Sequence, residues 1–175
     1  MSDKMYIKDT IKRFFEYDEA MVKFSYVFMR GKGKYNSKRV LDNIQKYVKE
    51  FSINDTNSRK KKDSSDHEKS CSVIIYCFDC DDYDIDPEPR KFLEDVSQYC
   101  HDNKYEFVWF CKDIERVYIG EKIPKSMKKK RAERFMRKNK IKKLHKERLT
   151  ADRYGENRSN LLRVLSQYEE LYLRE

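Results

Sequence analysis

The sequence predicts an α/β fold in which a parallel sheet is flanked by helices. Three short runs rich in β-branched and aromatic residues, at 24–29, 72–82 and 105–110, have the composition of buried strands. Segments with apolar residues at helical spacing, at about 37–51 and 90–103, separate these runs. Strands that alternate with helices of this length favour a parallel sheet joined by crossover helices. The length of 175 residues suits a single domain with appendages.

Three further segments are predicted around this sheet. Apolar residues at helical spacing over Met5–Tyr17 indicate an opening helix that packs on the domain. Residues 54–70 hold almost no apolar side chain and indicate a flexible surface insertion. The apolar stripe of residues 158–175 indicates a closing helix, with Ser159 or Asn160 as its N-cap.

The balance of charge points to a polyanionic partner. The chain has 40 Lys and Arg against 31 Asp and Glu, a net charge of +9. Nucleic acid is the default polyanion for such a protein. No apolar run approaches the roughly 20 residues of a membrane span, and the first residues lack the apolar core of a signal peptide. We therefore expect a cytoplasmic protein without a membrane partner.

Much of the positive charge lies in a basic segment, residues 122–148. Its only acids are Glu133 and Glu147, and a thin apolar seam predicts one or two helices with a cationic outer face. Like charges at this density repel, so we expect this face to bind phosphates of RNA or DNA, between which the sequence does not distinguish. The glycine loop RGKGK at 30–34 is either a tight strand-to-helix turn or a second phosphate contact. The predicted nucleic-acid-binding residues are Arg30, Lys32, Lys34, Lys128, Lys129, Lys130, Arg131, Arg134, Lys142 and Lys143.

Carboxylates gather where two predicted strands end. The second strand runs into DCDD, in which Asp79 and Asp81 would share one face, and Glu115 follows the third strand. The carboxyl ends of parallel strands meet at one edge of a sheet, where open α/β folds bind ligands. Adjacent carboxylates repel unless a cation or a proton lies between them. These residues, with Asp82 as a further ligand, predict a site for Mg²⁺ or Mn²⁺. The alternative is a strand followed by a solvated acidic turn.

The chain has five cysteines, and their spacing matches no disulfide framework. This usage is typical of reduced thiols in a cytosolic protein. Cys77 and Cys80 form a C-x-x-C, but residues three apart on a strand point to opposite faces. No second motif completes a tetrahedral zinc site, so we predict neither zinc nor redox chemistry at this pair.

The order of these parts resembles the Toprim-like proteins of the RloB and AbiL type. The likeness rests on a strand with a glycine loop, a strand ending in DCDD, a strand leading to KDIERVYIG, a basic helical segment and a final SNLLRVL helix. It covers most of the chain from about Phe24 to Tyr172. The resemblance implies a Toprim or Rossmann-like sheet and Mg²⁺-dependent cutting or joining of phosphodiester bonds. It also implies a role in phage defence, often beside an ATPase partner protein.

On this resemblance, Asp79 and Asp81 match the metal-binding D-x-D and Glu115 matches a later glutamate, which would make these three residues catalytic. The first motif departs from the family, because Arg30 stands where hydrophobic-Glu-Gly has its glutamate. Arg30 beside the aspartates would neutralise them without a metal. Two functions follow: a metal-dependent nuclease, or a degenerate domain that binds nucleic acid or a protein partner in a defence complex. A basic adaptor with a solvated acidic loop is a third interpretation, and the oligomeric state stays open.

Overall fold

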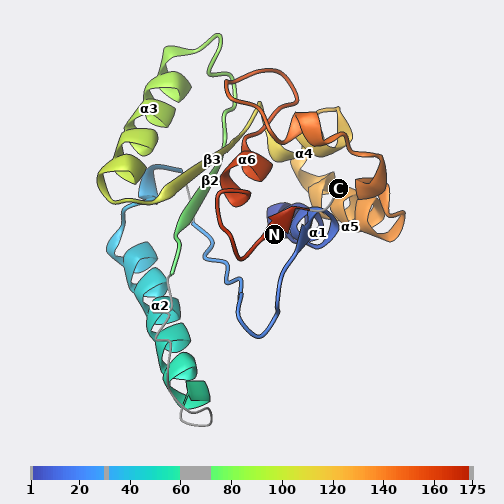
Figure 1. The fold of residues 1–175 in the computed structure, drawn as a ribbon. Coiled ribbons are helices and arrows are strands. Elements are labelled where there is room, and N and C mark those ends of the chain that lie inside the picture. The colour runs from blue at the N-terminus through green and yellow to red at the C-terminus, as the bar shows by residue number, and fades with distance from the viewer. Residues whose placement is uncertain (1, 30–31, 60–71, 174–175) are drawn as a thin grey trace. The chain divides into compact units, whose positions relative to one another are not determined.

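The structure is a computed structural model that describes residues 2–29, 32–59 and 72–173 (Figure 1). Helices and short strands make up these residues, as expected for the α/β class. The chain forms two compact units, one of Met1–Lys23 with Ile75–Glu175 and one of Phe24–Ile74. No helix in the described ranges is long and apolar enough to cross a membrane.

The larger unit contains a parallel pair of strands. β2 (Ile75–Asp79) pairs with β3 (Glu106–Phe110), in register along the whole length of both. α3 (Pro87–Asp102) connects them, and the Asp86 side chain caps its first turn by accepting a hydrogen bond from the Glu88 N–H at 2.9 Å. The predicted strand, crossover helix and strand are therefore confirmed in this part of the chain.

Aromatic side chains fix α3 against the strands. Tyr76 and Phe78 of β2 are both buried. The Tyr76 ring contacts Tyr99 at a centroid distance of 5.9 Å, and the Phe78 ring contacts Phe92 at 5.5 Å, both edge-on. Such edge-to-face pairs add to the free energy gained by burying the rings. This layer positions the carboxyl end of β2, where the candidate site lies.

The two ends of the larger unit meet in a small antiparallel sheet. α1 (Ser2–Phe14) is the predicted opening helix, and it leads directly into β1 (Phe15–Glu16). β1 pairs with β4 (Tyr172–Leu173) near the other end of the chain. Between them, the predicted closing helix is reduced to α6 (Leu161–Leu165), so that prediction is wrong in extent.

The two polar residues before α6, Ser159 and Asn160, form hydrogen bonds with different parts of the chain. The Asn160 amide oxygen accepts a hydrogen bond from the Trp109 N–H at 3.0 Å, and its amide nitrogen donates to the Phe107 carbonyl at 2.9 Å. Asn160 therefore holds the β3 backbone at two points. The Ser159 hydroxyl accepts from the N–H of Leu161 at 3.2 Å, whereas Asn160, the N-cap residue of α6, makes no side-chain cap hydrogen bond.

The smaller unit departs from the prediction at both of its elements. The described sheets pair β1 with β4 and β2 with β3, and residues 24–29 belong to neither, so the predicted first strand is wrong. Strand propensity expresses fit to a neighbouring strand, which this segment does not have in these sheets. α2 (Lys38–Arg59) extends through residues 54–59 of the predicted insertion, because no glycine or proline stops it. Arg30, Gly31 and residues 60–70 lie outside the described residues.

The chain after β3 forms the rest of the larger unit. α4 (Ile114–Ile119) ends at Gly120, whose φ of 87° is the left-handed conformation that favours glycine. α5 (Lys128–Arg137) is the one α-helix of the basic segment, and α1 packs against it. The Tyr6 ring of α1 is 0% exposed between Tyr118 and Phe135. Short 3-10 turns lie at Lys125–Met127, Lys140–Lys143 and Lys146–Arg148, and a further one, Lys32–Lys34, lies in the smaller unit.

Candidate carboxylate site

The first part of the site is the end of β2. Asp79 is its last residue, and the Oδ1 atom accepts a hydrogen bond from the Ile114 N–H at 2.9 Å. Asp113 caps α4 by accepting a hydrogen bond from the Arg116 N–H at 2.9 Å. The two aspartates thus satisfy N–H groups in the first turn of α4 that have no partner within the helix. This junction brings Asp79 close enough to Glu115 for their charges to interact.

A buried glutamate supplies the second carboxylate. Glu115 lies in the first turn of α4 and is 0% exposed. Its Oε2 atom accepts a hydrogen bond from the Lys128 Nζ at 2.6 Å, whereas its Oε1 atom has no hydrogen-bond partner. Lys128 is the first residue of α5, and its side chain is 30% exposed, so the ion pair reaches the surface at one end. A buried oxygen without a partner costs free energy, and a role in binding a ligand is one explanation for it.

The electrostatics of the site keep Asp79 near its titration point at neutral pH. Burial, the largest effect, and the charges of Asp3 and Glu115 together raise the pKa of Asp79 to about 7, against the opposing effects of Lys128 and the Ile114 N–H. For Lys128, burial disfavours the ammonium, but the contact with Glu115 outweighs it and raises the Lys128 pKa. A carboxyl whose pKa is shifted to neutrality by burial is a mark of functional sites.

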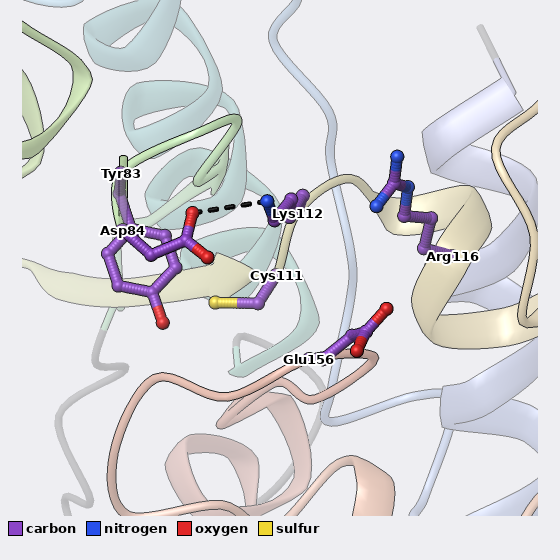
Figure 2. A pocket seen from close by; sticks show the side chains of 6 residues that line it. All are labelled: Tyr83, Asp84, Cys111, Lys112, Arg116 and Glu156. Carbon is purple, nitrogen blue, oxygen red and sulfur yellow. Dashed lines mark ion pairs between the residues drawn. The ribbon is translucent and has the colours of Figure 1, made fainter. Parts of the chain in front are cut away.

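The other two predicted acids lie apart from this pair. β2 ends at Asp79, so the strand face that Asp79 and Asp81 were expected to share does not continue to Asp81. Asp81 is exposed in a turn with a φ of 48°, and its N–H donates to the Lys112 carbonyl at 2.7 Å. Asp82 is exposed and forms an ion pair with the Lys112 Nζ at 3.3 Å. Lys112 also pairs with Asp84 at 3.2 Å, as Figure 2 shows.

The carboxylates of the site suit a magnesium ion in chemistry and number. Mg²⁺ is usually held by one or two carboxylates, with waters and substrate phosphates completing its shell. Asp79 and Glu115, whose Oε1 atom has no hydrogen-bond partner, are the two carboxylates that would have to serve as these ligands. Nowhere in the described ranges do three or more His, Cys, Asp or Glu residues come together in a group able to hold a metal ion. The Lys128 ammonium already contacts the other Glu115 oxygen, so a metal would share this carboxylate with a lysine.

The basic segment places most of its predicted contacts at the surface. Lys128 is the exception, because its side chain turns toward Glu115. Lys129 and Arg131 are partly neutralised by ion pairs, with Glu133 at 3.9 Å and Glu121 at 3.6 Å respectively. In the smaller unit Lys34 is exposed, Lys32 lies in a 3-10 turn, and Arg30 is outside the described residues. Of the predicted contacts in α5 and the following turn, the exposed ones are Lys129, Lys130, Arg134, Lys142 and Lys143.

The roles of two lysines, Lys128 and Lys112, were not predicted from the sequence. Lys128 was expected on the outer cationic face, and nothing in the basic run KSMKKKR distinguishes the lysine that turns inward. Lys112 bridges two aspartates, which its place just beyond the end of a predicted strand could have suggested. Lys112 also lines a cavity of about 150 Å³. The other lining residues are Tyr83, Asp84, Cys111, Arg116 and Glu156 (Figure 2).

Comparison with known proteins adds no relative. No family model, no curated protein and no solved structure matches this chain. Inference about function therefore rests on the residues of the site and of the basic segment.

Proposed function

We propose that the protein is a nuclease that cuts phosphodiester bonds of RNA or DNA with Mg²⁺ or Mn²⁺. The supporting observation is the convergence of Asp79 and Glu115 from segments far apart in sequence, with one buried Glu115 oxygen left without a partner. A bound cation would polarise a phosphoryl oxygen, which makes the phosphorus atom easier for a nucleophile such as water to attack. Asp79 and Glu115 would hold it, and both lie in the larger unit of the chain.

The residues around the carboxylates suit an anionic substrate. The Lys128 ammonium places a positive charge beside both acids, where a phosphate would be attracted and its developing charge stabilised. Asp79, with a pKa of about 7, can take up or release a proton at neutral pH. The exposed cations of α5 and of Lys140–Lys143 would hold the nucleic-acid backbone, so binding should weaken steeply with salt.

The wider proposal follows the sequence resemblance. The chain would be a Toprim-like protein of the RloB and AbiL type, acting in the cytoplasm in phage defence beside an ATPase partner. The DCDD segment and Glu115 support it, because β2 and β3 carry them to one edge of the parallel pair. Among the predicted ligands, Asp81 and Asp82 would have to move from their exposed turn to join the metal.

A second candidate function is favoured by the ion pair of Lys128 with Glu115. The ammonium gives Glu115 a cation that belongs to the protein itself. If this pair is permanent, the carboxylates hold the start of α5 in place, and the protein binds nucleic acid or a partner without cutting. The substitution of the family glutamate by Arg30 favours the same function.

The two functions are separated by a cleavage assay. Transfer RNA, single-stranded DNA and duplex DNA are incubated with the protein in Mg²⁺, in Mn²⁺ and in chelator. The variants are Asp79→Asn and Glu115→Gln, with Asp84→Asn as the matched control, an exposed aspartate near the same edge that takes no part in the pair. The variant Asp81→Ala tests whether cleavage requires Asp81 as well as Asp79.

The nuclease predicts metal-dependent cutting that Asp79→Asn and Glu115→Gln reduce by about 100-fold or more, while Asp84→Asn keeps it. A thermal melt of each variant shows that it is folded. Tight, salt-sensitive binding with no cleavage in either metal would instead establish the binding function.

A further inference from the structure

Two cysteines lie side by side at the ends of the parallel strands. Cys80 follows β2 directly, and Cys111 follows β3 directly. The strands are in register, and the Cys80 N–H donates to the Phe110 carbonyl at 2.9 Å, so the ladder continues past the strand ends. The two Sγ atoms are 3.1 Å apart, and the residues are 1% and 0% exposed.

We propose that Cys80 and Cys111 are a site of reversible oxidation, at which a peroxide converts the two thiols into a disulfide. The sulfur atoms need to approach by only about 1 Å, since a disulfide bond is about 2.05 Å long. Neighbouring strands lie about 4.8 Å apart, and disulfides join Cα atoms separated by about 4.4–6.8 Å. The bond is therefore compatible with the backbone as it stands.

Cys111 is the thiol that reacts first. Hydrogen bonding with the Cys80 thiol, the Gly155 backbone and the Tyr83 side chain outweighs burial and lowers the Cys111 pKa. Cys111 also lines the cavity of about 150 Å³ whose walls include the exposed side chains of Asp84 and Glu156 (Figure 2). A water molecule takes up about 30 Å³ of liquid, so this space admits hydrogen peroxide.

The reaction balances with peroxide as the only oxidant. The Cys111 thiolate attacks one peroxide oxygen, the O–O bond breaks, and a sulfenic acid and hydroxide form. The Cys80 sulfur then attacks the Cys111 sulfur, the S–O bond breaks, and water leaves as the disulfide forms. Two thiols lose two electrons and two protons, and one peroxide becomes two waters. A thiol reductant reverses the change.

The remaining described thiols are poor competitors. Burial raises the pKa of Cys77 to about 12 and that of Cys100 to about 11, which keeps both protonated. The C-x-x-C of the sequence is thus not the reacting pair, because Cys80 contacts Cys111 across the strands. The new bond would tie the chain next to Asp79 to the chain just before Asp113, on both sides of the carboxylate site.

The test counts and locates thiols after treatment with hydrogen peroxide at a small molar excess. The full-length protein is compared with Cys80→Ser, Cys111→Ser and the control Cys100→Ser. We expect accessible thiols after unfolding to fall from five to three, with a Cys80–Cys111 peptide found by non-reducing digestion and recovery after reductant. Cys80→Ser should accumulate a sulfenic acid on Cys111 that a dimedone probe traps, and Cys100→Ser should behave as wild type.

Other patterns would overturn the proposal. A mapped Cys77–Cys80 bond would mean that the C-x-x-C is the reactive pair. Equal thiol loss in Cys111→Ser and wild type would mean that oxidation begins elsewhere, for example at Cys71. Five thiols retained under peroxide would mean that the pair is inert. None of these readouts depends on nuclease activity, so this proposal and the proposed function can fail separately.

Discussion

Two groups near one edge of the sheet each consist of two carboxylates and one lysine, and they differ in how far the carboxylates are buried. In the inner group, Asp79 and Glu115 share the charge of Lys128; in the outer group, Asp82 and Asp84 share that of Lys112. Glu115 is 0% exposed, whereas the side chains of Asp82 and Asp84 are 67% and 45% exposed. Each group is thus two carboxylates around one half-buried lysine, and burial of the carboxylates is what differs, since the Lys112 and Lys128 side chains are 19% and 30% exposed.

The pKa of Asp79 in the inner group and the pKa of Asp84 in the outer group are shifted in opposite directions. It raises the pKa of Asp79 to about 7, despite the nearby Lys128. In the outer group, the hydrogen bond from Lys112 lowers the pKa of Asp84. The outer acids form surface ion pairs with Lys112, and such pairs contribute little to stability. The inner acids are the ones whose charge costs free energy, and so the ones that a metal or a substrate could use.

The largest expected effect is that of removing the inner lysine. Lys128→Met keeps the length of the side chain but leaves the Glu115 carboxylate buried without its cation. We expect a loss of about 3 kcal/mol in the free energy of unfolding at pH 8, because breaking a buried ion pair leaves an uncompensated charge. Urea denaturation followed by circular dichroism measures it.

The double variant Lys128→Met with Glu115→Gln is the control for this prediction. It removes the buried charge together with its partner, so it should recover more than half of the loss. If the double variant is no more stable than Lys128→Met alone, the loss comes from packing at the start of α5. The inner group would then not owe its stability to the pairing of a buried charge.

The next effect concerns the pH dependence of stability. The folded state holds the Asp79 proton more tightly than the unfolded state, whose carboxyl has the ordinary value of 3.8. The stability that this proton contributes is present at low pH and is lost as pH rises from about 4 to about 7. Asp79→Asn keeps an oxygen for the Ile114 N–H and never ionises.

We therefore expect Asp79→Asn to match the wild type near pH 4 and to exceed its stability by about 2 kcal/mol near pH 8. Unfolding free energies at four pH values between these limits give the comparison. A variant that is less stable than the wild type at pH 8 would show that ionised Asp79 is well stabilised in the fold. Greater stability on removing a charge would agree with a residue kept for function.

The sequence predicts the parts of this fold that depend on local periodicity. The strands at 75–79 and 106–110 were predicted at 72–82 and 105–110 from their short apolar runs, and the helix between them was predicted at 90–103 from its helical spacing. The helix begins earlier than predicted, at Pro87, because Asp86 and Pro87 are its N-cap and first residue rather than part of a turn. The strand predicted at residues 24–29 was wrong because strand-like composition does not show whether a neighbouring strand is present. The closing helix was wrong in extent because Tyr172 and Leu173 form β4, which pairs with β1 near the other end of the chain, and local periodicity does not show such a distant partner.

The candidate site was predictable only in part, for a similar reason. Asp79 and Glu115 were expected together, since parallel strands that carry them end at one edge. Asp81 was misplaced, because the turn with positive φ begins just after the strand and ends its alternation. The role of Lys128 is set by packing of α5 near α4, and its neighbours in the basic run have the same side chain.

The smallest expected effect is that of removing the outer lysine. Lys112→Met deletes the ion pairs to Asp82 and Asp84 at 3.3 and 3.2 Å, and both acids remain hydrated by solvent. Since surface pairs contribute little, we expect a denaturation midpoint equal to that of wild type within error, with less dependence on salt. The measurement is a set of thermal melts at low and high salt, beside Lys128→Met. A loss as large as that of Lys128→Met would mean that the turn after β2 depends on Lys112, and that exposure alone does not separate the two groups.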